Sequence, residues 1–532
     1  MGRVSQGCIV IVLCSAAAFA NIKLPAIISD NMVLQADAND RIWGWGDPDE
    51  NVTVTINEHE YRATSDAGGK WMVTLEAMKS SEIPFEMSVA GKNTITIRNI
   101  IVGQVWLASG QSNMDVPVIT VLDANSEIRN ATYPRIRLFT VLKDGGAINP
   151  VEDCNGQWVI CSPQTVAGYS AAAYYFGKAL HNKLNQPVGL INSSWGATSA
   201  EAWMSKSALK AKPEFAPIIQ RCEEMLKKYP TGKADYTIAM AQWQKEAADD
   251  AKKTGKPAKQ PTPFDPLIPP NGSSLLYNSM ISPIIKYSIK GTIWYQGESN
   301  ADRAKQYQKL FPSLIADWRQ HWQQGDFPFL FVQLANYKVP SVWCDPEAWA
   351  ELRDAQSKTL SVPNSGMAVT IDIGDANNIH PANKQEVGRR LALIALNKCY
   401  GRKTEYSGPM YKSMKIEKNQ IVITFDHVDS GLIAKGGPLK GFTIAGADRK
   451  FVAARASIQE TCFMRSDKSV IEVNDAAKIA VVIVENPDVS RPVAVRYAWQ
   501  DNPESANLYN GFGLPASPFK TDDWPWITEN IK

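Results

Sequence analysis

The sequence predicts an α/β protein in which a helix-covered parallel sheet is flanked by an N-terminal and a C-terminal β domain. In the middle of the chain, short apolar segments alternate with amphipathic helical segments, which is the pattern of a parallel sheet with both faces buried. On either side, strand-like segments follow one another without a helical stretch between them. A chain of 532 residues also exceeds one ordinary core. We therefore expect domains at 21–100, 101–405 and 406–532.

Residues 1–20 have the pattern of a signal peptide. Arg3 supplies the positive start, Cys8–Ala20 is apolar, and its last three residues match the small-x-small pattern of a cleavage site. The apolar run is too short to cross a bilayer, which takes about 20 apolar residues, and no later segment reaches that length. We therefore expect an exported protein, periplasmic or extracellular, with no membrane span.

The N-terminal domain is expected to be a small β-sandwich, because its apolar residues alternate with polar ones. The expected strands are Val52–Ile56, Lys70–Leu75 and Asn93–Ile100.

The central domain should contain at least five strands and three long helices. The expected strands are Gln104–Gly110, Pro187–Asn192, Gly291–Gly297, Phe327–Ala335 and Gly366–Gly374. The expected helices are Ala171–Leu184, Gln306–Trp322 and Asn383–Gly401, and the segment from about 225 to 270, rich in Lys, Ala and Pro, is interpreted as an insertion.

After residue 405 only strands are expected. They are Gln420–Phe425, Lys478–Glu485 and Val493–Trp499.

The charge balance argues against a nucleic-acid partner. The chain has 56 Lys and Arg residues against 54 Asp and Glu, a formal charge of +2. Nucleic-acid binders usually carry a concentrated basic excess instead.

Six cysteines follow the signal peptide, and two of them lie close together. Cys154 and Cys161 flank a short polar loop, so a local disulfide is expected in an oxidising compartment. Neither CxxC nor HExxH occurs, so we expect no zinc site.

Polar clusters follow four of the central strands, at the sheet edge where chemistry gathers in α/β proteins. They are Gly110–Met114, Asn192–Gly196, Gln296–Asn300 and Asp372–His380. A serine on a sharp strand-to-helix turn, such as Ser112, exposes its hydroxyl for nucleophilic attack. Taken singly, the clusters are explained about as well by ordinary hydrogen-bonded turns, and for Asn192–Gly196 an ordinary turn is the better explanation.

His380 is the best candidate for a general base. It alone among the histidines follows a buried central strand and precedes a helix, where a group with an ordinary pKa near 6.5 can accept a proton. The others lie in the flanking β regions or inside helices: His59, His181, His321 and His427.

Four motifs together resemble the sialate O-acetylesterase family of the SGNH hydrolase superfamily. They are "GQSNM", "GLINSSWGATSAEAWMS", "GTIWYQGESNA" and "IHPANKQEVGRRLA". The resemblance extends to "LPAIISDNMVLQ" near the start and "NLYNGFGLPASPF" near the end, so it covers nearly the whole mature chain. It implies a flavodoxin-like SGNH hydrolase domain that removes acetyl groups from sugars without a metal or organic cofactor.

The resemblance also implies roles for individual residues. Ser112 would attack the acetyl carbonyl and His380 would take its proton. The oxyanion would be held by the backbone N–H groups of Ser112 and Gly196 and by a side chain of the Gln296–Asn300 loop, for which we choose Asn300. Residues expected to contact the substrate are Gln111, Asn113, Trp195, Gln296, Glu298 and Arg353; a surface pairing on its helix explains Arg353 slightly better.

One position departs from the family pattern. Members usually carry Asp two residues before the histidine, and this chain has Asn378 there. In a serine protease triad, an Asp-to-Asn change costs about 10⁴ in turnover. Either Asp375 or Asp372 supplies the acid, or a Ser–His dyad suffices, or activity is weak; we choose Asp375.

Three functions remain in competition. The first is an exported sugar O-acetylesterase, acting on O-acetylated sialic acid or on a plant polysaccharide such as acetylated xylan. The second is a carbohydrate-binding protein that has lost its chemistry, as Asn378 suggests. A lipase or thioesterase ranks last, because no lid-like apolar segment is present.

Overall fold

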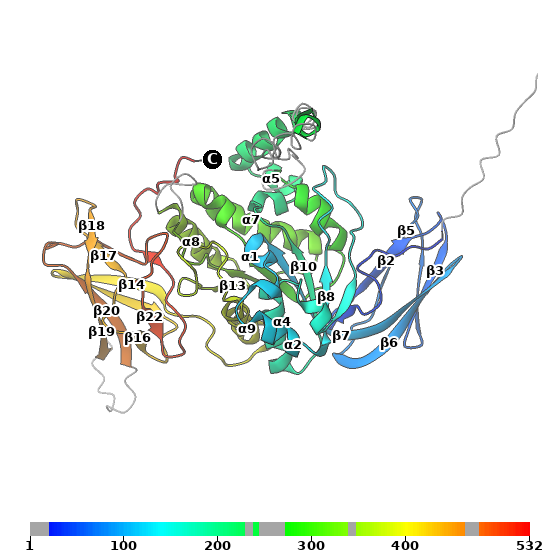
Figure 1. The fold of residues 1–532 in the computed structure, drawn as a ribbon, viewed down its shortest axis with the longest axis horizontal. Helices are drawn as coiled ribbons and strands as arrows, with labels where there is room; N and C mark the ends of the chain where they lie inside the picture. Colours follow the sequence, from blue (N-terminus) through cyan, green and yellow to red (C-terminus); the bar gives the residue numbers. More distant parts are fainter. Residues whose placement is uncertain (1–20, 229–237, 244–271, 339–346, 463–477, 532) are drawn as a thin grey trace, which may run out of the picture.

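The computed structural model describes residues 21–228, 238–243, 272–338, 347–462 and 478–531. Figure 1 shows three parts side by side: an α/β part in the middle, the N-terminal strands on one side and the C-terminal strands on the other. The expected signal peptide and most of the expected 225–270 insertion lie outside the described residues.

The central sheet has the strand order β13-β12-β11-β7-β10-β8-β9. Every neighbouring pair is parallel except β8 and β9, which pair antiparallel at one edge. The strands are β7 (Thr94–Gly110), β8 (Tyr133–Thr140), β9 (Trp158–Cys161), β10 (Val188–Ser194), β11 (Gly291–Tyr295), β12 (Phe329–Val332) and β13 (Ser365–Ala368). The predicted α/β class with flanking β regions is confirmed.

Both faces of this sheet are covered, and the side chains of β7 show why. Val105 and Leu107 belong to one buried apolar cluster, whereas Trp106 and Ala108 belong to another. Successive side chains on a strand point to opposite faces, so a strand buried on both faces must be apolar throughout.

Two pairs of long helices form the covering layers. Helices α4 (Ala171–Leu184) and α9 (Lys384–Tyr400) contribute to the cluster with Trp106, and α7 (Ala304–Trp322) and α8 (Ala348–Lys358) contribute to the other. The shorter helices are α1 (Ser112–Asp115), η1 (Val118–Thr120), α2 (Ala124–Asn130), α3 (Pro163–Val166), η2 (Ala200–Trp203), α5 (Lys206–Lys210), η3 (Pro213–Phe215), η4 (Tyr277–Ile281), η5 (Ser282–Ile284), η6 (Glu298–Arg303) and η7 (Thr359–Ser361).

Strand β7 belongs to two sheets. Its first half pairs antiparallel with β6 in the N-terminal region, and its second half pairs parallel with β10 and β11. The expected boundary at residue 100 therefore falls inside one continuous strand. The other N-terminal strands are β1 (Val33–Gln35), β2 (Arg41–Trp45), β3 (Asn51–Ile56), β4 (His59–Thr64), β5 (Lys70–Thr74) and β6 (Ser81–Ala90).

The C-terminal strands form separate antiparallel sheets, ordered β14-β15-β20-β19, β18-β17-β21-β23 and β16-β22. They are β14 (Met410–Glu417), β15 (Gln420–Asp426), β16 (Leu432–Ala434), β17 (Phe442–Ala445), β18 (Phe451–Ala453), β19 (Arg455–Cys462), β20 (Lys478–Glu485), β21 (Ala494–Tyr497), β22 (Leu508–Asn510) and β23 (Phe519–Lys520).

The expected disulfide between Cys154 and Cys161 is wrong for this structure. Both cysteines are free. Cys161 lies in the apolar cluster on one face of the central sheet, whereas Cys154 packs against the cluster on the other face. Burial raises the pKa of both thiols to about 12, so each is held as an inert thiol.

None of the helices in the described residues combines the length and apolarity needed to span a membrane.

Candidate active site

The predicted nucleophile lies at a tight turn where β7 ends. Ser112 is the first residue of α1, and Gly110 before it has a φ of +135°. A Cβ atom at Gly110 would lie 2.2 Å from the Tyr295 carbonyl oxygen, so no larger residue fits there. The Gln111 N–H donates to the same oxygen at 3.0 Å. The glycine and this bond to β11 fix the direction in which Ser112 leaves the sheet.

Gly196 lies directly against the nucleophile. A Cβ atom placed on Gly196 would be 3.3 Å from the Ser112 Cβ and 3.7 Å from its Cα. The Trp195 N–H donates to the Gly110 carbonyl at 3.1 Å, which ties this loop to the nucleophile turn. Within the described residues, the N–H groups of Ser112 and Gly196 have no acceptor. Two free backbone donors beside a serine hydroxyl are the elements of an oxyanion hole.

Gly196→Ala is expected to lower kcat/KM by about 10- to 100-fold, because the new methyl group would displace Ser112 and crowd the space between the two N–H donors. Steady-state hydrolysis of a small acetyl ester checks this. Gly168→Ala is the matched control, since a Cβ there meets nothing within 4 Å. Equal losses in both variants would contradict the assignment.

Asn113 joins the nucleophile turn to the loop that carries the base. Its Nδ2 group donates to the Ile379 carbonyl at 2.9 Å and to Glu298 Oε1 at 2.6 Å, and its Oδ1 accepts from Lys384 Nζ at 2.6 Å. Asn113 follows Ser112 and Ile379 precedes His380, so one amide side chain brings the two catalytic candidates together. Because that amide is buried and bonded on all sides, Asn113 does not face a substrate.

Burial changes the titration of the groups around Asn113. Burial lowers the pKa of Lys384 to about 7, and the Glu298 carboxylate opposes this shift. Burial also raises the pKa of Glu298. The pKa of His380 is lowered, first by burial and then by the positive charge of Lys384. His380 is therefore held ready to accept a proton.

The Gln296–Asn300 loop is held in place by side-chain amides, one from Gln111 on the nucleophile turn and two from the loop itself. Gln111 Oε1 accepts from the N–H groups of Gly297 and Ser299, both at 3.2 Å. Gln296, which is completely buried, donates from Nε2 to Asn300 Oδ1 at 2.6 Å. The expectation that Gln111 and Gln296 contact substrate is not supported, because both amides are enclosed in the loop.

The side-chain amide of Asn300 is likewise occupied by other partners. Its Nδ2 donates to Glu201 Oε2 at 2.8 Å, its Oδ1 accepts from the Ala200 N–H at 2.9 Å, and the residue is 1% exposed. This arrangement does not support Asn300 as an oxyanion donor; it holds η2 against η6 instead.

The His380 loop has no carboxylate bonded to the imidazole among the described residues. Asn378 Oδ1 accepts from the His380 backbone N–H at 2.9 Å, so it caps a turn. Asp375 Oδ1 likewise accepts from the Asn377 N–H at 2.8 Å. Asp372 forms a two-pronged ion pair with Arg390 at 2.6 and 2.8 Å. Of the two predicted acids, Asp372 is firmly engaged elsewhere and Asp375 remains a prediction.

Two predicted substrate-contact residues remain: Arg353, which lies outside the site, and Trp195, which lies beside it. Arg353 is completely buried, and its guanidinium donates to four backbone carbonyls, two of them in the C-terminal region at Gln500 and Asp501. It joins the two regions, and this burial does not support the expected substrate contact. Trp195 lies beside Gly196 with its side chain partly exposed, so it keeps its candidacy.

Sequence reasoning did not select Lys384. It lies four residues after His380, within the motif that carried the resemblance, and it is 0% exposed at the first position of α9. A lysine at that position of an amphipathic helix reads as a surface residue, so its burial depends on neighbours that the sequence does not reveal.

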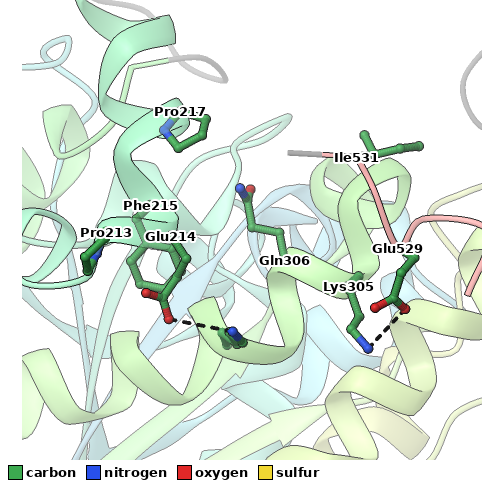
Figure 2. A pocket seen from close by; sticks show the side chains of 9 residues that line it. Pro213, Glu214, Phe215, Pro217, Lys305, Gln306, Glu529 and Ile531 are labelled. Carbon is green, nitrogen blue, oxygen red and sulfur yellow. Dashed lines mark ion pairs between the residues drawn. The ribbon is translucent and has the colours of Figure 1, made fainter. Parts of the chain in front are cut away.

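A separate pocket of about 290 Å³ lies between η3, the start of α7 and the C-terminal segment. Figure 2 shows its lining, including Phe215, Gln306 and the ion pairs Lys305–Glu529 and Lys309–Glu214. None of the predicted catalytic residues lines it, so it is distinct from the site around Ser112.

Comparison with known proteins agrees with the motifs. A family model described as "Carbohydrate esterase, sialic acid-specific acetylesterase" matches residues 262–397. Sialate O-acetylesterases from Rattus norvegicus and Homo sapiens are 29% and 28% identical, over 96% of this chain and 96% and 95% of their own.

A solved structure extends the likeness to the fold. A carbohydrate acetylesterase from Xanthomonas citri is 33% identical and superposes with a TM-score of 0.77, covering 94% of this chain and 100% of that one. The similarity spans 94% of the chain and therefore reaches all three parts of the molecule. The chain therefore belongs to the sialate O-acetylesterase family, and it is a carbohydrate acetylesterase.

Proposed function

We propose that this protein is an exported serine esterase that hydrolyses O-acetyl groups of sugars, with O-acetylated sialic acid as the first candidate substrate. The observation that carries the mechanism is the hydrogen bond from Asn113 Nδ2 to the Ile379 carbonyl at 2.9 Å. It joins the residue after Ser112 to the residue before His380, so nucleophile and base share one site. The pattern of residues 1–20 motivates the export.

The reaction proceeds in two halves. Ser112 Oγ attacks the acetyl carbonyl carbon while His380 takes the hydroxyl proton, and the oxyanion is held by the N–H groups of Ser112 and Gly196. The C–O bond to the sugar then breaks, and His380 returns the proton to the leaving sugar hydroxyl. Water, deprotonated by His380, attacks the acetyl-enzyme and releases acetate and free Ser112.

Ser112 and His380 carry out the proton transfers as a dyad in this mechanism. A third carboxylate normally holds the imidazole through its ring N–H. Here Asn378 and the Ile379 carbonyl hold the backbone of the base loop instead. Asp375, on the same loop, is the alternative acid, and its substitution decides between the two.

The sugar is identified by acetate release from a panel. The wild-type protein and Ser112→Ala are each incubated with 9-O-acetylated sialic acid, acetylated xylan and a small acetyl ester. A preference for sialic acid would match the relatives named sialate O-acetylesterase. A preference for xylan would be compatible with the solved relative, which is described only as a carbohydrate acetylesterase. No turnover by the wild type on any of the three would sink the esterase proposal and favour a binding protein.

The pH profile of kcat/KM should show an acidic limb below the ordinary histidine pKa of about 6.5. A general base works only when neutral, so activity rises as pH rises through its pKa. Burial and the Lys384 charge lower the pKa of His380, which extends activity toward acidic pH. Initial rates from pH 4 to 8 measure the limb; a midpoint above 6.5 contradicts the prediction.

A further inference from the structure

Lys384 occupies an unfavourable position for a cation. It is 0% exposed and begins α9, where the positive end of the helix dipole repels an ammonium group. Burying a charge costs several kcal/mol unless it is paired and hydrogen-bonded. A lysine kept in such a place indicates a task beyond packing, because an apolar residue would fill the space at lower cost.

The contacts of Lys384 all lead to the catalytic candidates. Its Nζ donates to Asn113 Oδ1 at 2.6 Å and lies 5.1 Å from the centre of the Tyr295 ring. Asn113 in turn donates from Nδ2 to Glu298 Oε1 and to the Ile379 carbonyl. Three elements that are distant in the sequence (the nucleophile turn, η6 and the start of α9) thus meet at one amide.

The side-chain amide of Asn113 has one acceptor oxygen and two N–H donors, and the surrounding groups permit only one orientation of this amide. Lys384 has donors alone, so it fixes the oxygen side; Glu298 and the Ile379 carbonyl are acceptors, so they fix the nitrogen side. Removing either charged end leaves the amide free to turn, and the hydrogen bond to the base loop weakens with it.

We propose that Lys384 and Glu298 are positioning residues: through Asn113 they hold the His380 loop against the Ser112 turn. This inference rests on the proposed function. The network fixes the backbone of the base loop beside the nucleophile turn, whereas a triad aspartate would hold the imidazole ring itself.

Among the described residues, the charged groups that face His380 or lie on its loop have the following partners. Lys384 of α9 is the charge that acts on the imidazole, and Glu298 of η6 faces Lys384. On the base loop itself, Asp375 caps Asn377 and Asp372 pairs with Arg390. Lys384 is therefore the group to remove.

The test compares Lys384→Met with Lys398→Met, an exposed lysine on the same helix. Lys384→Met should lower kcat by about 10- to 100-fold with little change in KM, because the reacting groups lose their alignment. The acidic limb of its pH profile should move to higher pH, whereas Lys398→Met should match the wild type. Unchanged kcat and an unmoved limb in Lys384→Met would overturn the inference.

A second measurement separates this inference from the proposed function. With five histidines in the chain, ring-proton NMR titration can follow His380, identified by its loss in His380→Gln. In Lys384→Met the pKa of His380 should rise, because the positive charge that disfavours the imidazolium is gone. This readout needs no substrate: an unmoved titration overturns the inference even if acetate is released, and a wild type that releases no acetate overturns only the proposed function.

A double variant separates a loss of stability from a loss of catalytic alignment. Lys384→Met alone leaves the Glu298 carboxylate buried without its cation, which lowers the melting temperature. Lys384→Met combined with Glu298→Gln removes both charges, so the melting temperature should recover while kcat stays low. Recovery of kcat together with stability would show that the pair serves folding alone and would overturn the inference.

Discussion

Ser112→Ala is expected to lower acetate release by about 10⁴- to 10⁶-fold while leaving the fold intact. The hydroxyl is the only atom lost, and no hydrogen bond of the Ser112 side chain is present among the described residues, so thermal unfolding should be unchanged. Rates with a small acetyl ester and with the preferred sugar measure the effect.

Ser109→Ala is the matched control for this variant. Ser109 lies near the end of β7, just before the turn that carries Ser112; it is completely buried and has a hydroxyl without a partner among the described residues. Its removal should therefore preserve activity. Residual turnover above one-tenth of wild type in Ser112→Ala, or equal losses in the two variants, would assign the nucleophile elsewhere.

His380→Gln should cost nearly as much as Ser112→Ala, and the two substitutions together should cost no more than either alone. Nucleophile and base act as one unit, so once either is missing the other has nothing to do. Single-turnover measurements on the three variants test this. Additive losses would contradict a shared mechanism.

Asp375→Asn and Asn378→Asp then decide how the imidazole is oriented. In a dyad, Asp375→Asn changes kcat less than about 10-fold, because its carboxylate only caps the Asn377 N–H. A loss near 10⁴ would instead show that Asp375 swings in as the third member of a triad. A gain in Asn378→Asp would show that the family's usual aspartate position is still within reach of the ring.

The layered fold was predictable because burial on two faces leaves a plain signature. Helix Ala171–Leu184 was predicted with its observed bounds, and Asn383–Gly401 differs from α9 by one residue at each end. Strand Gly366–Gly374 was expected to be longer than β13, which ends at Ala368. β13 ends where its partner β12 ends, at the pair Val332–Ala368, and the next carbonyl, that of Val369, accepts from Arg390 instead of from a strand.

The location of the site could be predicted from the sequence, but the directions in which its amide side chains point could not. The motifs locate four polar clusters at one sheet edge, and Ser112 and Gly196 meet there as expected. Which asparagine points at the nucleophile depends on partners such as Glu201, which binds Asn300, and Lys384, which binds Asn113. Those partners lie far apart in the sequence, so spacing alone does not reveal them.

The continuity of β7 also has a consequence for how the chain acquires its shape during synthesis. The first half of the strand finds its partners β1 and β6 among residues already made, and a hairpin of this kind forms early because its loop is short. The second half is apolar and must wait for β10 and β11, which are synthesised much later. We therefore expect the N-terminal sheet to hold the start of β7 extended before β10 and β11 exist, which would guard against the misassembly to which unpaired strands are prone. Cutting the chain at residue 100 would remove that template along with the domain.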